Sequence, residues 1–138
     1  MKMDVNPYLS FNGQCEAAFK FYENCLGGGG LSFHKYGGSP MAGDVPAEWQ
    51  DKVMHATLLF GNTALMGADA PPNFFTQPQG FSISLSVDKA EEADKVFAAL
   101  AEGGKIQMPI QQTFWTTRFG VLIDKFGIPW MVNCNQQP

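Results

Sequence analysis

The sequence predicts an α+β fold built from two βαβββ modules, because one pattern of landmarks occurs twice along the 138 residues. In each copy a short apolar strand leads into an amphipathic helix, and a pair of glycines ends the helix. One constant offset relates residues 9–11 to 85–87 and glycines 27–28 to 103–104. Each module alone is too small to bury its apolar surface well. We therefore expect the two modules to pair.

The first module covers residues 5–68. Val5–Phe11 predicts a strand, and apolar residues at helical spacing follow it up to a glycine run at 27–30 that ends the helix. Gly37–Asp51 is longer than most connections, so we expect a mobile flap or a disordered excursion there. The helical stripe consists of Cys15, Ala18, Phe19, Tyr22, Cys25 and Leu26, and the further strands are expected at Leu31–Tyr36, Val53–Phe60 and Thr63–Ala68.

The second module covers residues 80–134 and follows a proline-rich joint, in which we expect Asp69 to start a turn. Serines alternate with apolar residues over Phe81–Val87, which predicts a strand with one apolar and one small polar face. Asp88, with Glu91 three residues later, predicts the N-cap of a helix. The helical stripe is Ala93, Val96, Phe97, Leu100 and Ala101, and three strands are expected at Lys105–Ile110, Phe119–Lys125 and Ile128–Cys134.

Paired modules predict a single domain over residues 1–138, in which a curved mixed sheet surrounds a cavity. If a helix covers the outer face of each sheet, the inner face carries mainly small polar side chains, which leave room for a ligand. The inner-face residues are expected to be Asn6, Tyr8, Ser10, Ser82, Ser84 and Ser86.

Composition excludes some partners and favours others. The net charge is −4 and the nine basic residues are scattered, so there is no Lys/Arg-rich face for nucleic acid. Charged residues make up only 16% of the chain, which favours a homodimer that covers part of the surface. No apolar run is long enough to cross a bilayer. An odd number of cysteines without a C-x-x-C pair, and no leader-like start, favour a cytoplasmic protein.

Five segments resemble the vicinal oxygen chelate superfamily, which groups glyoxalases, bleomycin-resistance proteins and dioxygenases, and more narrowly its PhnB-like branch. The resemblance spans nearly the whole chain and implies the paired βαβββ fold. The segments are residues 6–11 (Asn-Pro-Tyr-Leu-Ser-Phe), 64–71 (Ala-Leu-Met-Gly-Ala-Asp-Ala-Pro), 79–85 (Gln-Gly-Phe-Ser-Ile-Ser-Leu), 113–115 (Thr-Phe-Trp) and 126–134 (Phe-Gly-Ile-Pro-Trp-Met-Val-Asn-Cys).

Metal-dependent members of this superfamily hold a divalent ion with His, Glu or Gln from the first and last strands of each module. The positions that match those ligands here are Asn6, Met66, Ser82 and Met131. None is a strong ligand for the ions that prefer carboxylate oxygen or imidazole nitrogen. We therefore expect no metal and no other cofactor.

Few other residues suggest chemistry. His34 and His55 lack an acidic or histidine partner at ligand spacing, so we interpret them as core or surface residues. The three cysteines are interpreted as inert thiols on buried faces. Phe114, Trp115 and Arg118 differ, because two aromatic rings and a cation in one loop form either a ligand-binding wall or a dimer contact.

The sequence thus favours a metal-independent protein that binds a small organic molecule, whose catalytic residues, if there are any, are unknown. The alternative is a metal-dependent lyase, dioxygenase or thiol transferase of the same superfamily. A methyltransferase, as a label of the branch suggests, is a further alternative, although no Gly-rich turn for an adenosyl group follows the first strand. The expected ligand-binding residues are Tyr8, Met66, Ser82, Phe114, Trp115, Arg118 and Met131.

Overall fold

The computed structural model describes all 138 residues and divides into two compact units, residues 1–77 and 78–138, which we describe one at a time. Each unit has one four-stranded mixed sheet and one long helix. The predicted order of strand, helix and three strands is therefore confirmed in both halves. That the chain forms one domain over 1–138 stays a prediction. No helix reaches the length and hydropathy needed to cross a membrane.

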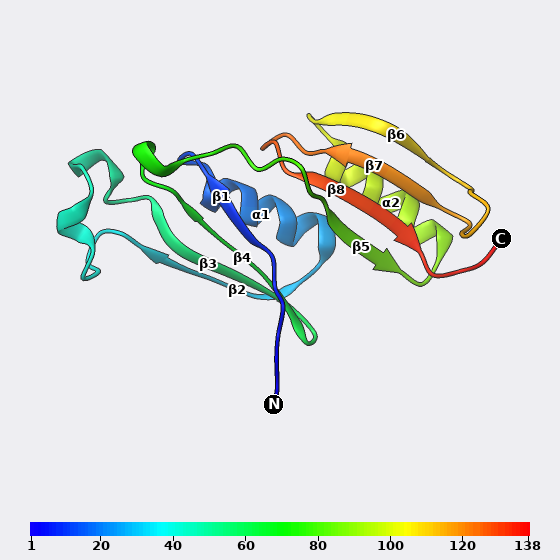
Figure 1. Cartoon of the computed structure of the whole chain (residues 1–138), viewed down its shortest axis with the longest axis horizontal. Helices are drawn as coiled ribbons and strands as arrows, with labels where there is room; N and C mark the ends of the chain where they lie inside the picture. Colours follow the sequence, from blue (N-terminus) through cyan, green and yellow to red (C-terminus); the bar gives the residue numbers. More distant parts are fainter. The chain divides into compact units, whose positions relative to one another are not determined.

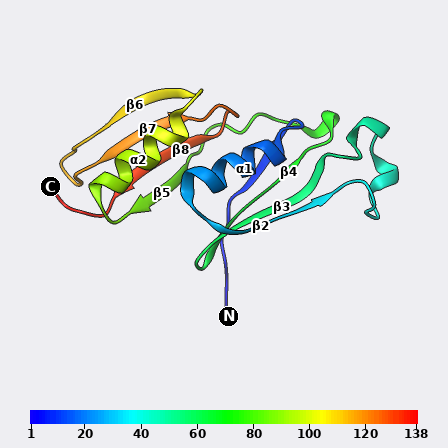
Figure 2. The same cartoon turned by 180° about the vertical axis from the view of Figure 1, so that it is seen from behind.

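The first unit has its strands in the order β1-β4-β3-β2. The edge strand β1 pairs with β4 in parallel, and the other neighbours are antiparallel. The helix α1 covers one face of this sheet, as the front and back views show (Figure 1, Figure 2). The elements are β1 (Tyr8–Phe11), α1 (Cys15–Leu26), β2 (Gly29–Lys35), β3 (Val53–Phe60) and β4 (Thr63–Asp69), with short 3-10 turns at Ala42–Asp44, Ala47–Trp49 and Pro72–Phe74.

The second unit repeats this topology with the strand order β5-β8-β7-β6, in which β5 and β8 are parallel. The helix α2 again covers one face of the sheet (Figure 1). The elements are β5 (Ile83–Val87), α2 (Ala90–Ala101), β6 (Lys105–Gln111), β7 (Phe119–Ile123) and β8 (Pro129–Cys134).

In each unit a glycine lets the helix lie close to its sheet. A Cβ added at Gly67 on β4 would lie 2.8 Å from the Leu9 carbonyl oxygen and 2.9 Å from the Phe19 ring of α1. A Cβ at Gly120 on β7 would lie 2.5 Å from the Phe97 ring of α2. All three distances are shorter than van der Waals contact, so the two buried phenylalanines occupy the space that the missing side chains leave.

Asp69 joins three elements of the first unit through its buried carboxylate. Its Oδ1 accepts hydrogen bonds from the backbone N–H groups of Gly13 and Cys15, both at 2.9 Å, and Oδ2 accepts one from Val53 at 2.9 Å. The carboxylate thereby holds the start of α1 and the start of β3 against the end of β4. It also takes the place of a local cap, because the N-cap residue Gln14 makes no side-chain hydrogen bond. From the sequence we expected Asp69 only to start a turn, and these three hydrogen bonds were not predicted.

The segment between β2 and β3 is folded, so the expectation of a disordered excursion over Gly37–Asp51 is wrong. Trp49 is buried and its ring meets Tyr36 edge to face at 6.2 Å. The Gln50 side-chain amide donates to the Ala42 carbonyl at 2.9 Å, and the Gly37 N–H donates to the Gln50 carbonyl at 2.8 Å.

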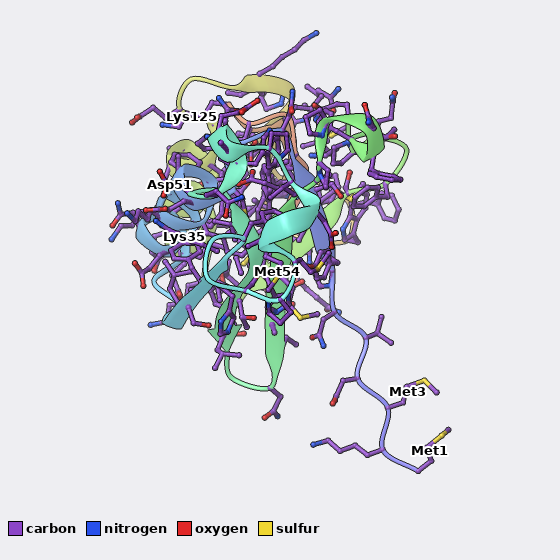
Figure 3. All side chains as sticks on the ribbon, turned by 90° about the vertical axis from the view of Figure 1, so that its left-hand side faces the viewer. Met1, Met3, Lys35, Asp51, Met54 and Lys125 are labelled. Carbon is purple, nitrogen blue, oxygen red and sulfur yellow. The ribbon has the colours of Figure 1, made fainter.

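Two further details at segment ends differ from expectation. The helix α2 begins at Ala90 with Lys89 as its N-cap, so Asp88 is not the cap. The Asp88 carboxylate instead accepts a hydrogen bond from the Asn135 side chain at 3.1 Å. At the other end of the chain, β1 begins at Tyr8 and not at Val5 as expected. The segment before β1 extends away from the first unit, with Met1 and Met3 at its tip (Figure 3).

Replacing Asp69 with Asn should destabilise the first unit strongly. The amide NH₂ would face backbone N–H groups that have no other acceptor, and an unsatisfied buried group costs about 1–3 kcal/mol. We expect a loss of about 2–3 kcal/mol in the free energy of unfolding, measured by urea denaturation. The control is Asp51→Asn at an exposed position, which should change stability by less than about 0.5 kcal/mol. Equal losses in the two variants would contradict the connecting role of Asp69.

Candidate functional site

The face of the first sheet that α1 leaves uncovered carries a cluster of polar side chains, which we name the first open face. Leu9, Leu58 and Leu65 are buried on the helix side, so their strand neighbours project from the other side by alternation. Tyr8, Met66 and Thr57 lie side by side across β1, β4 and β3, and His34 lies opposite His55 on β2 and β3. The first open face consists of Tyr8, His34, His55, Thr57 and Met66.

A hydrogen-bonded chain connects three of these residues. The Tyr8 hydroxyl lies 3.1 Å from His55 Nδ1, and His55 Nε2 lies 3.0 Å from Thr57 Oγ1. The His34 ring stands beside this chain, with its centroid 6.5 Å from that of His55. Partial burial raises the pKa of the Tyr8 phenol above its ordinary value, so the phenol is a neutral hydroxyl at physiological pH.

The contact between Tyr8 and His55 spans a strand. β4 lies between β1 and β3, and neighbouring strands are about 4.8 Å apart, so the phenol has to lie across β4 to bring its ring within 5.6 Å of the imidazole. Alternation puts Ala68 on the same face of β4 as Met66. In the register Tyr8 lies opposite Met66 and Ser10 lies opposite Ala68, so a phenol that reaches His55 runs diagonally from the Met66 row toward the Ala68 row.

The sequence placed both histidines in strands but assigned them no function. It missed their partner because Tyr8 is 47 residues from His55 along the chain, and no local spacing links the two. The available signal was the alternation within β3, which puts His55 and Thr57 on one face. The strand order needed to bring Tyr8 to them is a tertiary property.

The second sheet has its own uncovered face, which we name the second open face. Rows across β5, β8 and β7 place Ser84 beside Met131 and Val121, and Ser86 beside Asn133 and Phe119. Trp115 lies over this face, with its ring centroid 5.2 Å from that of Phe119. Its indole N–H donates to Asn133 Oδ1 at 3.3 Å. The second open face consists of Ser84, Trp115, Phe119, Met131 and Asn133.

The loop that carries Trp115 is held against β8 by hydrogen bonds of Thr116. Thr116 is buried, and its hydroxyl donates to the Cys134 carbonyl of β8. The Thr113 N–H donates to the Thr116 carbonyl at 2.9 Å, which closes a tight turn. Phe114 stands edge-on to Trp115 at 4.9 Å and is almost fully exposed. Trp115 is therefore a positioned ring that remains half exposed.

The expected grouping of Arg118 with the two aromatic residues is wrong in its geometry. Arg118 Nε donates to Asp94 on α2 at 2.9 Å, and Nη1 donates to the Thr117 carbonyl at 2.8 Å. The guanidinium thus turns to the helix-covered side of the sheet, away from the second open face. Ser82 directly precedes β5, on the side of Ser84 by alternation, and its expected role in binding stays a prediction.

The residues at the superfamily's metal-ligand positions do not fit a divalent ion. The Asn6 amide oxygen accepts the Ala64 N–H at 3.0 Å, and the thioethers of Met66 and Met131 are soft donors. Both ring nitrogens of His55 already have partners. No group of three His, Cys, Asp or Glu side chains is placed to hold a metal ion.

Two of the three cysteines are buried as expected, whereas Cys25 near the end of α1 is partly exposed. Cys15 and Cys134 are buried on the helix-covered sides of their sheets. Burial raises the pKa of the Cys15 thiol, with a smaller contribution from the Asp69 carboxylate, so the thiol stays protonated.

Comparison with known proteins assigns the family. A sequence model described as 3-demethylubiquinone-9 3-methyltransferase matches residues 3–133. The chain is 37% identical to protein YjdN of Escherichia coli K12, over 99% of both chains. The crystal structure of PA1353 from Pseudomonas aeruginosa is 47% identical over 99% of this chain and 100% of its own, with a TM-score of 0.89.

More distant structures extend the likeness. A putative 3-demethylubiquinone-9 3-methyltransferase, a PhnB protein from Bacillus cereus, is 26% identical with a TM-score of 0.74, over 96% of this chain and 99% of its own. A glyoxalase/bleomycin resistance protein/dioxygenase family enzyme from Burkholderia phytofirmans, 17% identical, shares the fold with a TM-score of 0.63, over 96% and 98%. The chain belongs to the PhnB-like family described as 3-demethylubiquinone-9 3-methyltransferase and has the fold of the glyoxalase/bleomycin resistance protein/dioxygenase enzymes.

Proposed function

We propose that the protein binds a small organic molecule without a metal ion, and that the ligand contacts the second open face. The observation that carries the proposal is the position of Trp115, a half-exposed ring held by Asn133 and Phe119. Such a ring offers a large contact area at little entropic cost, because its orientation is set before the ligand arrives.

The surroundings of Trp115 indicate the kind of ligand. Met131 and Phe119 offer apolar contacts, whereas Ser84 and the Asn133 amide offer hydrogen bonds. This combination suits a planar or partly aromatic molecule with one or two polar substituents. None of these side chains is charged, so shape and stacking contribute more to the affinity than ion pairing does.

The methyltransferase activity in the family's description is not part of this proposal. Adenosyl cofactors bind at Gly-rich turns of doubly wound parallel sheets. Here the connection from β1 to α1 contains one glycine, Gly13, and each sheet has only one parallel strand pair. A cytoplasmic location stays a prediction from the sequence, which assigns no catalytic residue.

The purified protein should contain no stoichiometric divalent metal. The expectation rests on the donor chemistry at Asn6, Met66, Ser82 and Met131, which are weak ligands for Mg, Mn, Ni or Zn. Elemental analysis after mild chelation provides the measurement. One Ni, Zn, Mn or Fe per chain that survives chelation, and is lost when these positions are mutated, would favour the metal-dependent alternative.

Replacing Trp115 with Ala should weaken ligand binding by about 1–3 kcal/mol, as expected for loss of an aromatic anchor. A library of aromatic fragments is first screened for compounds that raise the melting temperature, and their affinities are then compared between variants. Phe74→Ala is the matched control, because Phe74 is an exposed aromatic residue of the first unit. Its affinities should equal those of the wild type. The proposal fails if Trp115→Ala leaves every affinity unchanged.

We further propose that the chain forms a homodimer. Several large apolar side chains are about half exposed, among them Leu59, Ile106 and Met108, and burying them against a second copy would be favourable. Sedimentation at low micromolar concentration should give a species of twice the 15.1 kDa chain mass. A single species at the monomer mass would contradict this proposal.

A further inference from the structure

We propose that the first open face binds the carboxylate group of a small organic acid, and that His55 takes up a proton when the carboxylate binds. The inference goes beyond the proposed function, because it concerns the first unit alone and does not depend on the ligand of the second open face. It depends on the hydrogen-bonded chain of Tyr8, His55 and Thr57.

Counting protons in this chain shows what it offers a ligand when His55 is neutral. A neutral imidazole has one N–H donor and one nitrogen acceptor. One of the two hydroxyls, Tyr8 or Thr57, therefore donates inward to the ring, and the other accepts from it. Only the accepting hydroxyl can turn its own proton outward. In either tautomer the face thus presents a single outward O–H donor.

Protonation of His55 changes the number of hydroxyl protons that the face can turn outward. Both ring nitrogens become donors, and each already has a hydroxyl oxygen within hydrogen-bond distance, at 3.1 Å and 3.0 Å. Both hydroxyls now accept from the ring, so both can turn their protons outward. The face then presents two O–H donors and a positive charge, which together suit an anion with two oxygen acceptors.

No acidic side chain of the four strands projects from the first open face. The four strands of the sheet contain a single acidic residue, Asp69, and its carboxylate is buried on the helix side, where three backbone N–H groups occupy it. Cys15 lies on that side as well. An incoming carboxylate therefore meets no like charge projecting from these strands.

The other titratable groups of the sheet are both on β2. The Lys35 ammonium lies 3.7 Å from the Glu16 carboxylate of α1, so Lys35 forms an ion pair on the helix-covered side of the sheet. His34 faces the same side as His55 but has only a ring contact with it. Of the two imidazoles, His55 is the one whose nitrogens are both oriented by hydroxyls, and we assign the proton uptake to it.

Benzoate tests the inference, because it stays an anion above about pH 5 while histidine changes charge between about pH 5 and 8. Its affinity, measured by calorimetry, should fall roughly tenfold between about pH 6 and about pH 8. The neutral analogue benzamide should show no such change. No benzoate binding at about pH 6, or binding independent of pH, would overturn the inference.

The two histidine variants make a matched pair. His55→Gln removes the imidazole while keeping an amide that can hydrogen-bond. It should abolish the pH dependence and reduce the affinity at about pH 6 to the wild-type value at about pH 8. His34→Gln should keep the roughly tenfold dependence. If the dependence survives in His55→Gln, or disappears only in His34→Gln, the assignment to His55 is wrong.

The hydroxyls are tested by Tyr8→Phe and Thr57→Val, each of which removes one outward donor. Each should weaken benzoate binding at about pH 6 by roughly tenfold, the scale of one hydrogen bond to a charged group, with an unchanged melting temperature. Wild-type affinity in both variants would overturn the two-donor geometry. Failure here is distinguishable from failure of the proposed function, which is read from the metal content and from fragment binding to the Trp115 variant.

Discussion

The first unit depends on one buried carboxylate. Asp69 ends β4, and its two oxygens accept the N–H groups that open α1 and β3. Those groups come from segments distant in sequence, and no other side chain caps α1. The Tyr36 hydroxyl donates to the Asp69 carbonyl at 2.8 Å, which ties the folded segment after β2 to the same point. The strands whose side chains form the first open face are thus held in place from the opposite side of the sheet.

The second unit also contains a buried carboxylate that accepts several hydrogen bonds, but it lies at a different position in the fold. Asp124, at the turn between β7 and β8, accepts the N–H groups of Phe126 and Ile128 with one oxygen and the Trp130 indole N–H with the other. Both carboxylates are buried and each holds several donors, because a buried charge is tolerated only when its acceptor capacity is used. The two modules therefore share a topology without sharing the residues that secure it.

The sequence predicted the order and most boundaries of the elements, because alternation and helical spacing are local. The helical stripes with Phe19 and Phe97 lie where the spacing put them. Features that depend on long-range neighbours were missed. Asp69 resembled a turn residue, Arg118 resembled a partner of Trp115, and His55 had no visible partner. Each side chain finds its contacts on another element, Arg118 on α2 and His55 on β1.

The path of the Tyr8 side chain over β4 has a consequence for how the first open face can vary. The reach from β1 to β3 is diagonal, because Tyr8 lies opposite Met66, whereas His55 lies one row further along, toward Ala68. The side chain at position 68 has no functional group, yet a much larger one there would crowd the path of the phenol to the imidazole. A change of volume at position 68 could thus turn a coupled acid–base pair into two independent groups, with every polar residue still in the sequence. An apolar side chain of β4 would then control a polar contact in which it takes no part.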